Sequence, residues 1–243
     1  EQQRSNPLLP SRAPFQRFDF VRREVQVTAI PVVQVGGRIV LEDNTDVLIA
    51  VDVSRSMLAA DVHPNRLERA KVDILDLIDE LRGDHAGLLA FRRRGVLLCP
   101  LTSDYAFLRQ ALDGLSPESA PRGETDLADA VRKALEALEG MAEDHNAILL
   151  ISDGEQLTGD AAEAAREAGR RGIPIFTVGI GDPAGATIPG EKAGDLFRFQ
   201  GQAVQTRLMD ETLEVIARAS GGSYIPLATA GTDQRYFVYE GKK

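Results

Sequence analysis

The fold of this chain is decided by the stretch Asp46-Val47-Leu48-Ile49-Ala50-Val51-Asp52-Val53-Ser54-Arg55-Ser56. Its first half is an aliphatic run, which is typical of a buried strand in a parallel sheet. Its second half places one carboxylate and two hydroxyls at alternate positions, which project to the same side of an extended segment. Such hard oxygen ligands suit a small divalent cation such as Mg²⁺. Alone, the motif leaves a second interpretation open, in which Asp52, Ser54 and Ser56 only cap the next helix.

Two later segments carry side chains of the same kind. Gly123-Glu124-Thr125-Asp126 precedes a predicted helix, and Ile151-Ser152-Asp153-Gly154-Glu155 ends a second aliphatic run. Ligands of open α/β sheets bind beyond the carboxyl ends of the strands, so the loops that follow both runs meet at one edge. Gly154 allows a sharp turn directly after Asp153. All three segments together favour a metal site over helix capping, with the ligands Asp52, Ser54, Ser56, Thr125 and Asp153.

From Asp46 onward, apolar strands alternate with amphipathic helices. This alternation predicts a doubly wound α/β fold, with a mostly parallel central sheet and helices on both faces. Pro64 suits the first turn of the first helix and Gly83 its end. A Gly/Pro-rich stretch follows Gly181 and leads to a hairpin candidate at 196–206. We expect strands at about 46–52, 86–91, 95–99, 147–151, 173–180 and 223–225, and helices at about 64–83, 104–115, 125–140, 160–171 and 210–219.

The chain divides into three parts by composition. Residues 1–44 form a polar leader that ends in a β-rich stretch around Gly36-Gly37, which predicts a hairpin outside the main fold. Residues 45–230 form the α/β domain, and residues 231–243 a C-terminal tail. The length of 243 residues is sufficient for one large domain with an appendage.

Composition excludes several classes of protein. A formal charge of −9 argues against a general nucleic-acid binder, and we interpret the basic run Arg92-Arg93-Arg94 as a solvated turn. The single cysteine, Cys99, permits no intrachain disulfide and sits in an apolar setting typical of a buried filler. No signal peptide is found, and no stretch approaches the ~18 apolar residues of a membrane span.

The three-part motif resembles the metal-ion-dependent adhesion site (MIDAS) of a von Willebrand factor type A (VWA) domain. The resemblance covers about residues 45–230 and implies the Rossmann-like VWA fold. Within that superfamily the chain is similar to the bacterial Bat proteins of aerotolerance operons (BatA- and BatB-like). That closer similarity rests on Met57-Leu58-Ala59-Ala60-Asp61-Val62-His63-Pro64-Asn65-Arg66-Leu67, Cys99-Pro100-Leu101-Thr102-Ser103-Asp104-Tyr105 and Val178-Gly179-Ile180-Gly181.

The resemblance implies a role for each site residue. Ser54, Ser56 and Thr125 would contact Mg²⁺ (or Mn²⁺ or Ca²⁺) through their hydroxyls. Asp52 and Asp153 would act largely through coordinated waters, and the sixth position would be filled by a carboxylate of a partner protein. Few direct carboxylates leave the ion electrophilic toward an incoming Asp or Glu, and the N-terminus of the helix after Thr125 adds partial positive charge.

The sequence supports nucleotide-binding and enzymatic interpretations less well than a metal-dependent binding site. Gly179-Ile180-Gly181-Asp182-Pro183-Ala184 imitates a dinucleotide fingerprint but opens no helix, and no P-loop sequence is present. A phosphatase would need a second Asp where Ser54 stands, and no His is placed on the same loops to activate Ser54 or Ser56. The three histidines have no partners at zinc-ligand spacing.

We therefore expect a non-enzymatic, Mg²⁺-dependent protein-interaction domain. A structural scaffold with a vestigial or merely stabilising ion is the alternative, and a metal-dependent hydrolase a minor one. The Bat resemblance implies a parent protein anchored in a membrane, with the extracytoplasmic side favoured. It also implies association with other Bat-like proteins and a MoxR-type AAA+ ATPase. We expect no nucleic-acid partner.

Overall fold

The computed structural model describes residues 32–35, 38–41, 45–81, 83–140, 145–156, 159–190, 192, 194–226 and 237–239. Its centre is a six-stranded sheet in the order β12-β7-β6-β3-β4-β5. Every neighbouring pair in this sheet is parallel except the edge pair β4–β5. In that order, the strands are β12 (Tyr224–Pro226), β7 (Ile175–Gly179), β6 (Asn146–Ser152), β3 (Asp46–Asp52), β4 (Ala86–Phe91) and β5 (Gly95–Thr102).

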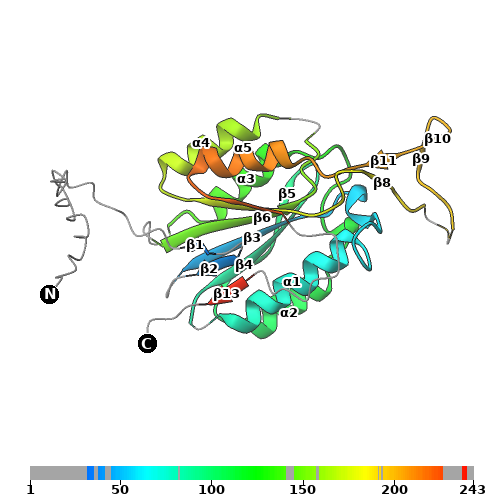
Figure 1. Ribbon diagram of the computed structural model, residues 1–243. Coiled ribbons are helices and arrows are strands. Elements are labelled where there is room, and N and C mark those ends of the chain that lie inside the picture. The colour runs from blue at the N-terminus through cyan, green and yellow to red at the C-terminus, as the bar shows by residue number, and fades with distance from the viewer. Residues whose placement is uncertain are drawn as a thin grey trace, which may run out of the picture.

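In the part of the chain that the structure describes, five α-helices cover the sheet, two on one face and three on the other (Figure 1). Alternate residues of β3 divide between the two layers: Val47, Ile49 and Val51 pack in the core with α1 and α2, whereas Leu48 and Ala50 pack with α3, α4 and α5. The predicted α/β fold is therefore confirmed. The helices are α1 (Arg66–Glu80), α2 (Tyr105–Asp113), α3 (Leu127–Ala137), α4 (Ala161–Arg170) and α5 (Asp210–Ser220), with 3₁₀ turns η1 (Arg55–Leu58) and η2 (Pro117–Ser119).

The first helix begins later than expected. The prediction that Pro64 stands in its first turn is wrong, because α1 starts at Arg66 and Asn65 is its N-cap. The Asn65 side chain accepts a hydrogen bond from the Glu68 N–H at 2.8 Å. An Asn side chain satisfies a free N–H of the first helical turn, so it fixes the start one residue after itself.

A second, smaller sheet consists of β1 (Val32–Val35), β2 (Arg38–Leu41) and β13 (Phe237–Tyr239). β1 and β2 pair antiparallel, which confirms the hairpin predicted in the leader. The rest of that prediction, at residues 25–31 and at Gly36-Gly37, lies outside the described residues. β13 pairs parallel to β2, so residues 237–239 of the predicted tail join the leader near α1 (Figure 1).

The segment after β7 forms an arm that projects from the carboxyl end of the sheet (Figure 1). It contains β8 (Ala186–Thr187), β9 (Arg198–Phe199), β10 (Gln202–Ala203) and β11 (Gln205–Thr206). β9 and β10 form an antiparallel hairpin and β11 returns along β8, which confirms the late hairpin. Among the described residues, no helix has the length and apolar character needed to cross a membrane.

Candidate metal centre

The predicted ligands are buried at the carboxyl end of the central sheet. Asp52 is the last residue of β3, and Asp153 directly follows β6, the parallel neighbour of β3. Ser54 and Ser56 follow Asp52 in the η1 loop, and Thr125 precedes α3. Each of the five residues is at most 6% exposed, and both carboxylates are fully buried.

Direct contacts join four of these residues. The Ser54 N–H donates to Asp52 Oδ1 at 2.8 Å, and the Ser54 and Ser56 hydroxyls lie 2.8 Å apart. The Ser56 side chain in turn hydrogen-bonds to Asp153. Oxygen atoms of two of the three predicted segments therefore converge, although the role of each residue as a metal ligand remains a prediction.

Thr125 reaches the same edge through its neighbour. The Asp126 N–H donates to the Arg92 carbonyl at 2.9 Å, directly beyond β4. The Val53 N–H donates to the Phe91 carbonyl, also at 2.9 Å, so the loops after β3 and before α3 are both fastened to the end of β4. The Asp126 side chain caps α3 by accepting from the Asp129 N–H at 2.9 Å, which fixes where the helix begins.

Ser152 also contacts the candidate site, and the sequence analysis did not assign it a role there. Its hydroxyl donates to Asp52 Oδ2 at 2.7 Å and accepts from the Gly154 N–H at 3.0 Å. It therefore orients one predicted ligand and ties the two carboxyl loops together. The available signal was a hydroxyl at the end of an otherwise apolar strand, where a buried polar group needs a partner.

Arg66 is the second residue that the sequence analysis missed. Its side chain is fully buried, and Nη1 donates to Asp153 Oδ2 at 2.8 Å while Nη2 lies 2.6 Å from Asp61 Oδ2. Asp61 also accepts from the Asp182 N–H at 2.8 Å, and the Thr206 hydroxyl donates to Asp153 Oδ2 at 3.3 Å. The signal was an arginine on the buried face of an amphipathic helix.

Two glycines leave space that this arrangement requires. Gly181 has φ +137°, and a Cβ atom there would lie 2.8 Å from the Arg66 guanidinium carbon. Gly181 thus leaves room for the Arg66 side chain. Gly154 has φ +77°, and a Cβ atom would lie 2.4 Å from the Met209 carbonyl oxygen.

Burial raises the pKa of both carboxyl groups. Burial, followed by the negative charge of Asp153, raises the pKa of Asp52 to about 7. Burial also raises the pKa of Asp153, although hydrogen bonding to Ser56 and the charge of Arg66 oppose this shift. Burial acts in the same direction on Asp61, but hydrogen bonds from Arg66 outweigh it, so the pKa of Asp61 lies below its usual value.

The donor set fits a hard divalent cation. Within the described residues, Asp52 forms no ion pair, while Arg66 is shared by Asp61 and Asp153, so negative charge is in excess. Two carboxylates and three hydroxyls offer the oxygen ligands that Mg²⁺ prefers. No group of three or more His, Cys, Asp or Glu suited to a metal occurs in the described part of the chain.

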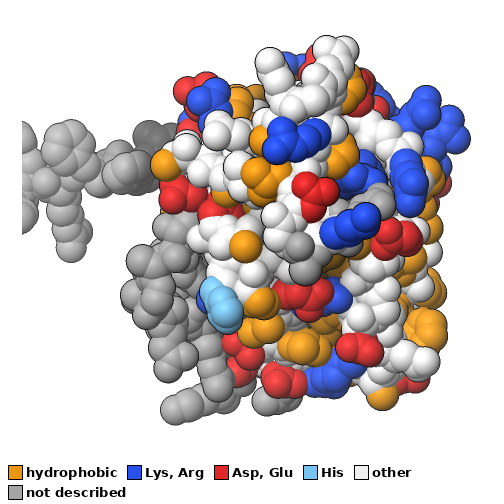
Figure 2. Space-filling model, turned by 90° about the vertical axis from the view of Figure 1, so that its right-hand side faces the viewer, with side chains coloured by type: hydrophobic (Ala, Val, Ile, Leu, Met, Phe, Trp, Pro, Cys, Tyr) orange, Lys and Arg blue, Asp and Glu red, His pale blue; other side chains and the backbone are white. Residues whose placement is uncertain are grey.

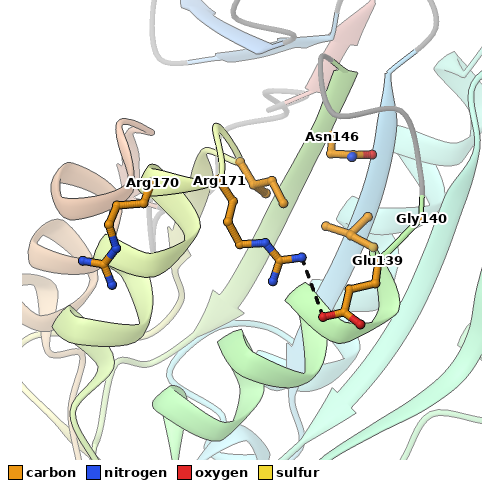
Figure 3. Close-up of a pocket in the computed structure, with 7 residues that line it drawn as sticks. Glu139, Gly140, Asn146, Arg170 and Arg171 are labelled. Atoms are coloured by element: carbon orange, nitrogen blue, oxygen red, sulfur yellow. Dashed lines mark ion pairs between the residues drawn. The ribbon is translucent and has the colours of Figure 1, made fainter.

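A separate pocket of about 410 Å³ lies at the other end of the sheet. Asn146, at the start of β6, lines it, whereas the predicted ligand Asp153 follows the end of the same strand. Arg171 reaches across the pocket to Glu139, with 3.9 Å between charged atoms (Figure 3). This pocket is therefore not part of the candidate metal centre.

Comparison with known proteins supports the resemblance. The family model of the von Willebrand factor type A domain matches residues 47–156, which include the predicted ligands. The crystal structure of an aerotolerance-related membrane protein from Bacteroides fragilis has a TM-score of 0.73 and 35% identity, covering 76% of this chain and 92% of that one. The chain belongs to the VWA family, among its Bat-like members.

Other relatives agree with this assignment. BatB from Bacteroides thetaiotaomicron is 37% identical with a TM-score of 0.73, covering 75% of this VWA chain and 90% of that one. A UPF0353 protein of Mycobacterium ulcerans is 31% identical over 199 residues, which are 75% of this chain and 55% of that protein. The chain thus spans about half the length of the curated relatives it matches. The mussel byssus protein PTMP1, with a zinc-occupied MIDAS motif, shares the fold at 17% identity and a TM-score of 0.57.

Proposed function

We propose that this VWA domain is a non-enzymatic module that holds Mg²⁺ and, through the ion, binds a carboxylate of a partner protein. The ligands proposed are Asp52, Ser54, Ser56, Thr125 and Asp153. The observation that carries the proposal is the pair of fully buried carboxylates beside paired serine hydroxyls, with too little positive charge to balance them. A divalent cation would supply that charge.

The chemistry of the site favours binding over water activation. Arg66 takes one oxygen of Asp153, and Ser54 and Ser152 occupy both oxygens of Asp52. Both carboxylates are thus held in place by protein donors. A metal with few direct carboxylates keeps its charge available to an incoming Asp or Glu.

A second candidate function is a structural module in which the ion only stabilises the fold. The two buried ion pairs of Arg66, with Asp61 and with Asp153, favour this structural role. Arg66 neutralises part of the negative charge of these carboxylates without any metal. The two candidates differ in one respect: only the first makes association with a partner depend on Mg²⁺.

We further propose that the parent protein works in a membrane-associated bacterial assembly with other Bat-like proteins and a MoxR-type AAA+ ATPase. The related Bacteroides fragilis protein is described as an aerotolerance-related membrane protein, which supports this setting. Mn²⁺ or Ca²⁺ are alternative ions for the same oxygen ligands.

The test is capture of partners from a bacterial extract, with EDTA or with Mg²⁺, followed by mass spectrometry. We expect proteins that are captured with Mg²⁺, lost with EDTA, and lost with Thr125→Ala. Ser103→Ala is the matched control. It removes an exposed hydroxyl that follows β5, at the end of the sheet where β4 begins and therefore opposite to the candidate metal centre. Capture that is equal with EDTA and unaffected by Thr125→Ala would contradict the proposal, and a rise in thermal stability with Mg²⁺ alone would then favour the structural role.

A further inference from the structure

The candidate metal centre is bordered by four arginines from three loops, which we call the arginine rim: Arg55, Arg92, Arg93 and Arg122. Arg55 stands in η1 between two predicted ligands, Arg92 and Arg93 follow β4, and Arg122 lies in the loop before α3. All four are partly or fully exposed, so they are accessible next to buried carboxylates.

Contacts within the rim hold these loops together. Arg92 Nε donates to the Gly123 carbonyl at 3.1 Å. Gly123 has no side chain, and a Cβ atom there would lie 2.4 Å from Arg93 Cδ, so Arg93 packs against this backbone. On the other side, the Arg55 guanidinium lies over the Phe197 ring of the arm, 4.6 Å from its centroid. Arg92 and Arg93 are therefore held against the loop before α3, and Arg55 against the arm.

The rim concentrates positive charge in an acidic chain. Partial burial and then the positive charges of Arg55 and Arg122 lower the pKa of Arg92, while the negative charges of Asp52 and Glu118 oppose the shift. Arg92 is thus in the electric field of two other rim arginines and of one predicted ligand. The chain as a whole has a formal charge of −9. Figure 2 views this end of the molecule and shows Lys and Arg side chains gathered on one part of it.

We infer that the arginine rim binds an acidic segment of a partner protein, in which one carboxylate occupies the ion and its neighbours pair with the arginines. This inference rests on the proposed function and adds the composition of the partner. Guanidinium groups pair with carboxylates in a planar, bidentate geometry, so several arginines around one carboxylate site match a run of Asp or Glu. A basic patch on an acidic protein also steers such a segment toward the site.

The test measures the affinity of two fluorescein-labelled peptides by anisotropy with Mg²⁺. One is a Gly/Ser peptide with a single central Glu, and the other has Glu at all central positions. We expect the second to bind about tenfold more tightly, equivalent to about 1.4 kcal/mol. The variant R55Q/R92Q/R122Q should reduce this preference to about twofold or less and weaken its dependence on salt, because exposed charge pairs are screened.

Two controls keep the result interpretable. The variant R166Q/R170Q/R218Q removes the same charge from exposed positions on α4 and α5, and should retain the preference. Calorimetry with Mg²⁺ alone checks that the rim variant still holds the ion.

The outcomes separate the two proposals. Mg²⁺-dependent binding with equal peptide preference in the wild type and the rim variant would overturn the inference and leave the proposed function standing. If EDTA leaves the affinity of both peptides unchanged, the proposed function itself is overturned. Loss of the preference in both arginine variants alike would show an effect of net charge only, which also overturns the inference.

Discussion

At the scale of single residues, Arg66 joins the metal centre to the core. Among the described residues it is the largest fully buried side chain, and its two ion pairs bridge residues that are far apart in the sequence. A buried arginine is tolerated because Asp61 and Asp153 occupy its donors. We infer that it positions the Asp153 carboxylate before any ion arrives.

Replacement of Arg66 with Met should strongly destabilise the fold. Met keeps much of the apolar volume but leaves Asp61 and Asp153 without a cation, and breaking one partner of a buried pair costs about 3–5 kcal/mol. Urea unfolding measures this difference. The control Arg109→Met breaks an exposed pair with Asp79 and should cost less than about 1 kcal/mol. Equal effects of both substitutions would show that the buried pairs contribute nothing particular.

The stability of the metal-free domain should depend on pH through Asp52. Its pKa is about 7 in the folded state, against 3.8 for an ordinary Asp. Between these values the folded state holds a proton that the unfolded state has lost, so stability falls as the pH rises through that window. Thermal unfolding in EDTA across that range measures the effect.

Asp52→Asn is the matched control for this pH dependence, because it keeps the shape of the side chain and cannot ionise. We expect its unfolding temperature to vary less than that of the wild type over the same range. If both proteins follow the same pH profile, another group is responsible.

At the scale of elements, the loops that leave β3 and β6 depend on local backbone geometry. Gly154 turns the chain away after Asp153, and the Met209 N–H donates to the Asp153 carbonyl at 2.7 Å. The loop after β6 is thereby fixed against the start of α5, which holds the second carboxylate in place.

Gly154→Ala should disrupt this loop by more than its dihedral strain. The new Cβ atom meets a backbone oxygen at 2.4 Å, which no side-chain rotation relieves. Gly172→Ala is the control, because Gly172 has a similar φ of +71° with nothing within 4 Å of the added Cβ. We expect a cost of about 1 kcal/mol for Gly172→Ala and clearly more for Gly154→Ala, with weaker Mg²⁺ binding only in the latter. Calorimetry and urea unfolding measure both quantities, and equal costs would argue against the clash.

At the scale of the whole molecule, ion binding should appear as added stability. A ligand that binds only the folded state at 100 times its dissociation constant adds about 2.7 kcal/mol. For a domain of this size that corresponds to a rise of roughly 5–10 °C in the unfolding temperature. Differential scanning calorimetry with and without Mg²⁺ measures the shift, and Thr125→Ala should reduce it. An unchanged temperature in the wild type at saturating Mg²⁺ would contradict a metal centre.

The order of elements and the position of the site follow from local sequence signals. Aliphatic runs such as Val47–Val51 and Ala147–Ile151 mark buried strands, because a strand covered on both faces has no polar positions. Polar residues that end two such runs indicate one edge, because parallel strands present their carboxyl ends together. The boundaries were less predictable: α1 starts at Arg66 because the Asn65 cap, and not Pro64, fixes its beginning.

Tertiary structure alone decided the contacts between distant segments. Arg66 meets Asp153 across 87 positions of the sequence, and Ser152 meets Asp52 across 100. The arginine rim and the pairing of β13 with β2 likewise bring together segments that are distant in the sequence. Periodicity reports which face of an element is buried, but not which buried polar groups meet, because that depends on how the elements pack. The sequence by itself thus determined the fold and where its polar side chains gather, while packing determined how their charges are balanced.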